Sequence, residues 1–378
     1  MTRVTSQRLR FQQPSLPAAA AIERYLAAAR DERWFSNCGP CWRLLRDRLS
    51  EATGCESVPV ANATLGLIVA IAALRPRGPR KARQALVPSF AFAASAQSAV
   101  WNGLEPVFVD IDPDHWHVAP DALERALAQR RGDVAIVIAL SSFGTPPPPD
   151  VRRFWEDSCS AAGVPLLVDS AAGFGARAAD GRPIGSQGDA EVVSFHAVKP
   201  LAAGEGGAVF TRDPDLAAEI LSLTGFAFDE RRSATRPDGI NAKMPEHTAA
   251  IALASLDEYP DALAARRAAA AQILDELPEG FRPQLEHERG TWQFVPVSAS
   301  SAEARADVLS AAGEAVELRT YYDPLHRMPA FAECERTDGL AVTTELSERM
   351  LSLPMAADFE PDEIAAIGMM LRAAVDRT

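Results

Sequence analysis

The stretch VPLLVDSAAGFGARAADGRPIGSQGDAEVVSFHAVKPLAAGEGGAVF, residues 164–210, contains two short apolar runs, each leading to a residue that can carry chemistry. The first run ends at Asp169, and the second, VVSFH, is soon followed by Lys199. Runs of this length are typical of buried strands, and open α/β folds bind ligands at the carboxyl ends of their strands. The glycine-rich GEGGAVF predicts a tight loop leading into another strand. We therefore expect Asp169 and Lys199 to lie close together at one edge of a sheet.

A carboxylate and a lysine in this arrangement meet the requirements of pyridoxal 5'-phosphate. The cofactor ring stabilises carbanion charge only while its pyridine nitrogen is protonated, which favours a buried carboxylate beside that nitrogen, and a lysine amine binds the aldehyde. Asp169 and Lys199 are the predicted catalytic residues for these two roles. The spacing alone leaves a second interpretation open, in which Asp169 caps a strand end and Lys199 is a solvated surface lysine.

Motifs across nearly the whole chain resemble those of the DegT/DnrJ/EryC1/StrS aminotransferases, a family of sugar aminotransferases of the fold-type-I pyridoxal phosphate class. In chain order they are FSNCGP, NATLGL, PSFAFAASA, PVFVDIDP, VDSAAGFGA, GRPIGSQGDA, SFHAVKPLAAGEGGA, GINAKM and YYDPLH. Their shared order is far more specific than any one motif, so the resemblance favours the cofactor-binding interpretation of Lys199. It also implies transamination, because relatives that dehydrate their substrate carry histidine in place of this lysine.

Strand-like and helix-like segments alternate along the chain, which predicts an α/β fold with a mostly parallel sheet covered by helices on both faces. The resemblance implies a large cofactor-binding domain with an N-terminal helix, residues 1–248, and a smaller C-terminal α+β domain, residues 249–378. In the smaller domain we expect WQFVPV and VELRTYY to be strands around the helical EARADVLSAA.

The predicted phosphate site lies where a strand runs directly into a helix, because free N–H groups at a helix N-terminus bind phosphate without a basic side chain. The short strand VPVAN leads into an apolar helix that opens at Ala63 and Thr64, so we assign these residues to the cofactor phosphate. The Thr64 hydroxyl can also cap that helix, and the two roles are compatible.

The resemblance implies the remaining site residues. Phe92 matches the residue that stacks on the cofactor ring, and Ala171 lies on the opposite ring face. Ser194 offers its hydroxyl to the phosphate, and Asn241 reaches the phosphate of a neighbouring subunit, which implies a homodimer with shared active sites. Three residues of the RTYYDPLH stretch are predicted near the substrate: Arg319, Tyr321 and His326.

The sequence departs from the family pattern at three positions near the predicted site. Ala172 stands where glutamine or histidine often contacts the phenolic oxygen of the cofactor, Ser141 replaces a frequent histidine, and Lys243 replaces an arginine. Cofactor binding remains the prediction, whereas these departures leave open which molecule accepts the amino group.

The resemblance implies transfer of an amino group from an amino acid, glutamate by the family pattern, to a keto group of a nucleotide-linked sugar. Two alternatives stay open. One is a transaminase for a cyclitol or another small keto metabolite, and the other is a pyridoxal phosphate-bound regulatory protein without turnover.

Composition narrows the classes of partner. With 38 Lys and Arg against 51 Asp and Glu, the net charge is −13, which disfavours nucleic acid and anionic membrane surfaces. The N-terminus lacks the apolar core of a signal peptide and no apolar run is long enough to span a membrane, so we expect a cytoplasmic enzyme. We assign no metal ligand.

The five cysteines are odd in number and scattered, which predicts reduced thiols. The sequence Cys38-Gly39-Pro40-Cys41 matches a thioredoxin-type redox motif, but it follows an alanine-rich helical stretch rather than a strand. We interpret it as a turn that opens a helix, with Asn37 as the N-cap and Pro40 in the first turn.

Overall fold

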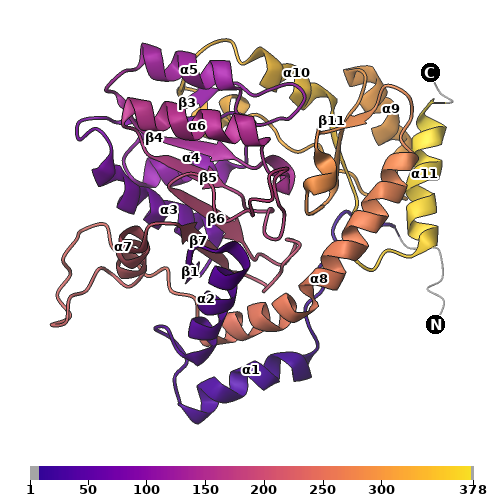
Figure 1. Cartoon of the computed structure of the whole chain (residues 1–378). Coiled ribbons are helices and arrows are strands. Elements are labelled where there is room, and N and C mark those ends of the chain that lie inside the picture. Colours follow the sequence, from indigo (N-terminus) through magenta and orange to yellow (C-terminus); the bar gives the residue numbers. More distant parts are fainter. Residues whose placement is uncertain (1–7, 376–378) are drawn as a thin grey trace.

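The computed structural model describes residues 8–375 and contains an eight-stranded sheet surrounded by helices (Figure 1). In spatial order the strands are β1 (Glu56–Val60), β7 (Gly207–Thr211), β6 (Ala190–Ser194), β5 (Leu166–Asp169), β4 (Val134–Leu140), β2 (Gln84–Pro88), β3 (Glu105–Val109) and β10 (Glu335–Arg336). Neighbouring strands are parallel except for the two pairs that include β7. The predicted α/β fold with a mostly parallel sheet is confirmed.

Helices cover both faces of this sheet because successive strand residues point to opposite sides. On β2, Ala85 and Val87 pack into a core with α3 (Ala63–Leu74), α4 (Ala93–Trp101) and α7 (Pro214–Thr224). The residue between them, Leu86, packs into a separate core with α5 (Pro120–Gln129) and α6 (Pro149–Ala162). Burial on both faces explains why these strands appear in the sequence as continuous apolar runs.

The C-terminal region is organised around α8 (Glu246–Asp275), a long helix that extends from the sheet toward the C-terminal strands and helices (Figure 1). The remaining elements are β8 (Arg282–Pro283), β9 (Val295–Ser298), α9 (Ala302–Ala312), α10 (Ala341–Arg349), β11 (Met350–Leu353) and α11 (Pro361–Val375), with β9 between β8 and β11 in an antiparallel sheet. The helix α8 runs through residue 248, where the sequence predicts the domain boundary, and that boundary stays a prediction.

The prediction of a strand at VELRTYY is wrong. Residues 316–322 contain only isolated bridges, from Val316 to Leu9 and from Arg319 to Ser352. Val316 and Tyr321 pack against the C-terminal core, so their apolar character comes from side-chain packing and not from a strand ladder. In WQFVPV only the second half is a strand, which begins at Val295.

The turn before α2 (Pro40–Thr53), which follows α1 (Ala19–Asp31), differs from the expected capping arrangement. Gly39, not Asn37, is the N-cap residue, and because glycine has no side chain it cannot accept from the first N–H groups of the helix. The buried carboxylate of Glu246 takes that place by accepting from the N–H groups of Cys41 at 2.6 Å and Trp42 at 3.3 Å. A Cβ on Gly39 would lie 2.6 Å from the Glu246 carboxyl carbon, so glycine permits the approach.

We expect Glu246→Ala to lower the free energy of unfolding by about 2 kcal/mol, because two N–H groups at the start of α2 lose a charged acceptor. Glu246→Gln keeps an acceptor oxygen and should cost about half as much. Urea unfolding followed by circular dichroism measures both values, with the exposed Glu230→Ala as the control. Equal unfolding curves for Glu246→Ala and Glu230→Ala would show that the carboxylate does not stabilise this junction.

The cysteines of the CGPC turn lack the low pKa of redox-active thiols. Burial raises the pKa of Cys41 to about 12, and burial also raises the pKa of Cys38. All five cysteines are unpaired.

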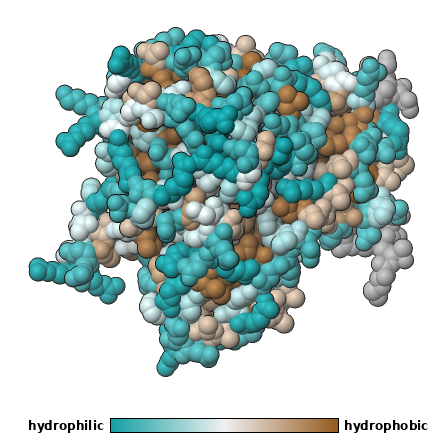
Figure 2. Space-filling view, viewed as in Figure 1, coloured by the Kyte–Doolittle hydropathy of each residue, from teal (hydrophilic) through white to brown (hydrophobic). Residues whose placement is uncertain are grey.

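The face of the molecule seen in Figure 2 is covered mainly by hydrophilic residues, with apolar residues in small separate patches. Within residues 8–375, no helix combines the length and the apolar character needed to cross a membrane.

Candidate active site

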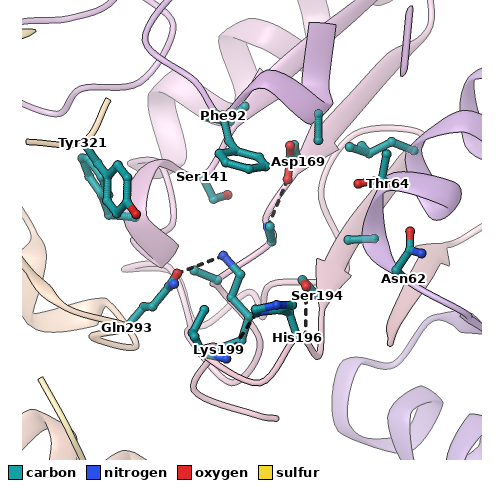
Figure 3. A pocket seen from close by; sticks show the side chains of 18 of the residues that line it. Asn62, Thr64, Phe92, Ser141, Asp169, Ser194, His196, Lys199, Gln293 and Tyr321 are labelled. Atoms are coloured by element: carbon teal, nitrogen blue, oxygen red, sulfur yellow. Dashed lines mark hydrogen bonds between the residues drawn. The ribbon is translucent and has the colours of Figure 1, made fainter. Parts of the chain in front are cut away.

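A cavity of about 740 Å³ lies at the carboxyl ends of β4, β5 and β6, where residues from the C-terminal region meet the sheet (Figure 3). Its lining includes most of the residues predicted from the sequence: Ala63, Thr64, Phe92, Asp169, Ala171, Ser194, Lys199 and Tyr321. Other lining residues include Gln12, Asn62, Trp101, Ser141, Phe143, Ala172, His196, Glu205, Gln293, Phe294 and Tyr322. Within the described chain, Lys199 is the only lysine in this lining, and the lining contains no arginine.

Asp169 is the last residue of β5, and its buried carboxylate is oriented by two donors. The Ser95 hydroxyl, on α4, donates to Oδ2 at 2.6 Å, and the N–H of Ala171 donates to Oδ1 at 3.1 Å. Burial raises the pKa of Asp169, and the two hydrogen bonds and the charge of Lys199 oppose that shift. The carboxylate is therefore a fixed acceptor that gains stability from a positively charged neighbour.

Lys199 lies in the turn between β6 and β7, and its side chain extends into the cavity. Its Nζ donates to Oε1 of Gln293 at 2.9 Å (Figure 3). Burial lowers the pKa of Lys199 to about 8, and the charge of Asp169 acts in the opposite direction. A substantial fraction of the amine is therefore neutral, and nucleophilic, in mildly alkaline solution.

The N-terminus of α3 forms another wall of the cavity. Asn62 is the N-cap, and its side-chain oxygen accepts from the N–H of Leu65 at 2.9 Å, so Thr64 is not the capping residue. The hydroxyl of Ser194, at the end of β6, lies in the same cavity and accepts from the N–H of His196 at 3.2 Å. A Cβ on Gly207 would lie 2.9 Å from the nitrogen of Ala63, so glycine allows β7 to pack closely against the start of this helix.

Phe92 and Ala171 provide apolar surface within the cavity. Phe92 precedes α4 and is 62% exposed, whereas the rest of that turn is buried. An aromatic side chain with so much free surface is available to a flat ligand.

The serine at position 141 belongs to a buried polar network beneath the cavity. The hydroxyl oxygen of Ser170 lies 2.8 Å from Ser141 Oγ. The same hydroxyl also contacts the carboxylate of Glu191, which is fully buried. Gln187 donates to the same carboxylate at 3.0 Å. Burial raises the pKa of Glu191 to about 7. Ser141 therefore joins the cavity floor to a carboxyl group that no solvent reaches.

Three predicted residues lie outside this lining. His326 is buried, and its Nδ1 lies 2.7 Å from the Ser89 hydroxyl. Arg319 pairs with Glu317 and lies over the ring of Phe11 at 5.7 Å. Asn241 is exposed and accepts from Lys243 at 2.7 Å. The roles assigned to these three residues stay predictions.

The structure also adds residues that the sequence did not indicate. Ser95 and Gln293 contact the predicted acid and the predicted lysine directly, and Asn62 caps the helix at the predicted phosphate site. Only Asn62 had a sequence signal, since an asparagine before an apolar helical run is typical of an N-cap.

A comparison of the sequence with models of known protein families finds the same family that the motifs resemble. The model of the DegT/DnrJ/EryC1/StrS aminotransferase family matches residues 18–372. The chain belongs to this family. The resemblance inferred from the motifs is therefore confirmed, and the protein is a pyridoxal phosphate-dependent aminotransferase.

Relatives match this aminotransferase over nearly its full length. Protein Rv3402c of Mycobacterium tuberculosis (strain H37Rv) is 33% identical over 371 residues, covering 96% of this chain and 89% of that protein. The dTDP-4-amino-4,6-dideoxy-D-glucose transaminase of Escherichia coli is 26% identical, with coverage of 95% and 96%. The crystal structure of DesI in the presence of its TDP-sugar product is similar with a TM-score of 0.86 at 34% identity, covering 98% of this chain and 94% of that chain.

The cavity of this family member fits the cofactor that the family uses. The buried Asp169 carboxylate has donors on both oxygens but no cation bonded to it within the described residues, which suits a protonated ring nitrogen. The first turn of α3 and the nearby Thr64 and Ser194 hydroxyls suit a phosphate, and Lys199 provides an amine in the same cavity.

Proposed function

We propose that this aminotransferase moves an amino group from glutamate to a keto group of a nucleotide-linked sugar. The observation that carries the proposal is the single cavity shared by the Asp169 carboxylate and the Lys199 amine, with the hydroxyls of Thr64 and Ser194 in its wall. The nucleotide-sugar part is supported by DesI, solved with its TDP-sugar product, and by the Escherichia coli dTDP-sugar transaminase.

Each residue has a distinct task in this proposal. Bound pyridoxal phosphate supplies the electron sink that stabilises charge at the donor Cα. Lys199 would bind the cofactor aldehyde and, once free, its amine would take the proton from the donor Cα and return it to the cofactor. Ser95 orients the Asp169 carboxylate, which would stabilise the protonated ring nitrogen of the cofactor. Phe92 and Ala171 would offer apolar surface to the two faces of the ring.

The test is to incubate the enzyme with glutamate and a panel of nucleotide-linked keto sugars, with free cyclic ketones as the comparison set. Formation of 2-oxoglutarate together with an aminated nucleotide sugar is expected. Exchange of the amino group between glutamate and labelled 2-oxoglutarate, without any keto sugar or cyclic ketone, checks turnover separately. Absence of that exchange would contradict the proposal and support the alternative of a pyridoxal phosphate-bound regulatory protein without turnover.

One structural feature keeps a second substrate class in consideration. Ala172 and Ser141 line the cavity with small side chains, at positions where the motif resemblance implies glutamine or histidine. These departures from the family pattern keep open a cyclitol or another small keto metabolite as the acceptor. Turnover with free cyclic ketones and none with nucleotide-linked sugars would support that alternative and overturn the leading proposal.

We further propose that the active form is a homodimer in which Asn241 of one subunit contacts the cofactor phosphate of the other. Asn241 does not line the cavity of its own chain, and its side chain is exposed. Exposed aromatic residues nearby, Phe226 and Phe228, and Trp101 at the cavity, provide apolar surface for a second copy.

Mixing two impaired variants tests this arrangement. Lys199→Ala and Asn241→Ala homodimers are each expected to be impaired. Subunits of the two variants that are unfolded and refolded together should regain roughly a quarter of the wild-type activity, because half of the dimers would contain one complete site. No recovery above the separately refolded variants would contradict a site shared in this way.

A further inference from the structure

Gln293 is a polar side chain that the family assignment leaves without a role. It lies in the loop before β9, is 8% exposed, and lines the same cavity as Lys199. Its Oε1 accepts from the lysine Nζ at 2.9 Å (Figure 3). The lysine comes from a turn of the large sheet, whereas Gln293 comes from the C-terminal region, so the contact joins two parts of the chain.

A neutral partner suits an amine that must lose and regain a proton. The long, flexible lysine side chain loses orientation unless a partner holds its end. A carboxylate at this distance would strongly favour the ammonium form, whereas an amide oxygen orients the amine with a weaker effect on its charge. Burial already lowers the pKa of Lys199 to about 8, and Asp169 is the charged group that opposes this shift.

The other half of the amide is available to a ligand. Within residues 8–375 the Nε2 of Gln293 has no hydrogen-bond partner, although the side chain is nearly buried and faces the cavity. No arginine lines the cavity in the described chain, so a substrate oxygen beside Lys199 would meet a neutral donor, and the Gln293 amide is the donor held next to that lysine.

We propose that Gln293 is a positioning residue that holds the free amine of Lys199 toward the cavity through Oε1 and donates through Nε2 to an oxygen of the bound substrate. This role rests on Lys199 being the lysine that binds the cofactor. The other titratable side chains lining the cavity are His196, Glu205, Tyr321 and Tyr322, and Lys199 Nζ has a hydrogen bond to Gln293 and none to these four within the described residues.

The experiment measures how fast the cofactor-free protein captures pyridoxal 5'-phosphate between pH 6 and pH 10. Visible absorbance follows the reaction, and borohydride trapping with peptide mapping identifies the labelled lysine among Lys81, Lys199 and Lys243, the three lysines of the chain. Wild-type capture should rise with pH around a midpoint near 8, because only the neutral amine attacks the aldehyde.

Gln293→Glu should raise this midpoint by about one pH unit or more, because a carboxylate beside the amine stabilises its protonated form. Gln293→Asn, whose shorter side chain cannot reach the amine, should slow capture by roughly tenfold at every pH. The matched control is Gln12→Glu, which adds a carboxylate to the same cavity at a residue without a hydrogen bond to Lys199, and its midpoint should move less. Thermal unfolding of each variant checks that the fold is intact.

Two results would overturn the role of Gln293 alone: a midpoint in Gln293→Glu no higher than in Gln12→Glu, or wild-type capture by a folded Gln293→Asn variant. If wild-type protein carries no trapped label on the Lys199 peptide, the assignment of Lys199 fails, and the role of Gln293 fails with it. Normal labelling of wild type at Lys199 therefore separates a failure of this inference from a failure of the proposed function.

Discussion

Replacing Lys199 with alanine is expected to lower the rate of amino transfer by about 10⁴-fold or more, because the chain loses the amine that binds the cofactor aldehyde and moves the proton. Amino-group exchange between glutamate and 2-oxoglutarate measures the loss. The variant should also lack the visible absorbance that arises when the cofactor is joined to a lysine. Thermal stability should change little, since removing a buried amine also removes the cost of burying it.

The small number of lysines makes this experiment well controlled. Lys81 is exposed and lies outside the cavity lining, so Lys81→Ala should keep wild-type exchange activity and wild-type absorbance. Borohydride reduction of wild type should place the cofactor label on the peptide that contains Lys199. An unchanged absorbance band in Lys199→Ala, or label found mainly on Lys81 or Lys243, would overturn the assignment on which the proposed function depends.

Replacing Asp169 with asparagine should lower the exchange rate by at least about 100-fold, because a neutral amide no longer stabilises the protonated ring nitrogen of the cofactor. The cofactor-free variant should be at least as stable as wild type. Burial raises the pKa of the Asp169 carboxyl, which shows that its charged form is costly in this environment, and the neutral amide avoids that cost.

Ser95→Ala is the matched control for this prediction, since it keeps the carboxylate and removes one of its donors. We expect a loss of about tenfold or less, in line with one hydrogen bond. Exchange assays and thermal unfolding of the cofactor-free proteins give both readouts. Activity in Asp169→Asn equal to that of Ser95→Ala would mean that the charge at position 169 has no special part in the reaction.

The sequence determined the features that depend on local patterns. Apolar runs buried on both faces of a sheet identified the strands that end near Asp169 and Lys199. Strand ends in a parallel sheet share an edge, so the sequence alone predicts that both residues lie in one place. Thr64 was predicted from a strand that leads directly into a helix, Phe92 and Ser194 from the resemblance to the family, and all three line the same cavity.

The tertiary structure decided what no local pattern encodes. Ser95 contacts Asp169 across 74 positions of the sequence, Gln293 contacts Lys199 across 94, and Glu246 caps α2 across 205. The apolar residues of VELRTYY suggested a strand, yet they serve side-chain packing in the C-terminal core. The spacing of apolar residues in the sequence specifies which face of a helix or strand is apolar. The hydrogen-bond partners of a polar side chain depend instead on how the elements pack together. For that reason only the folded chain reveals which residues hold Lys199 and Asp169.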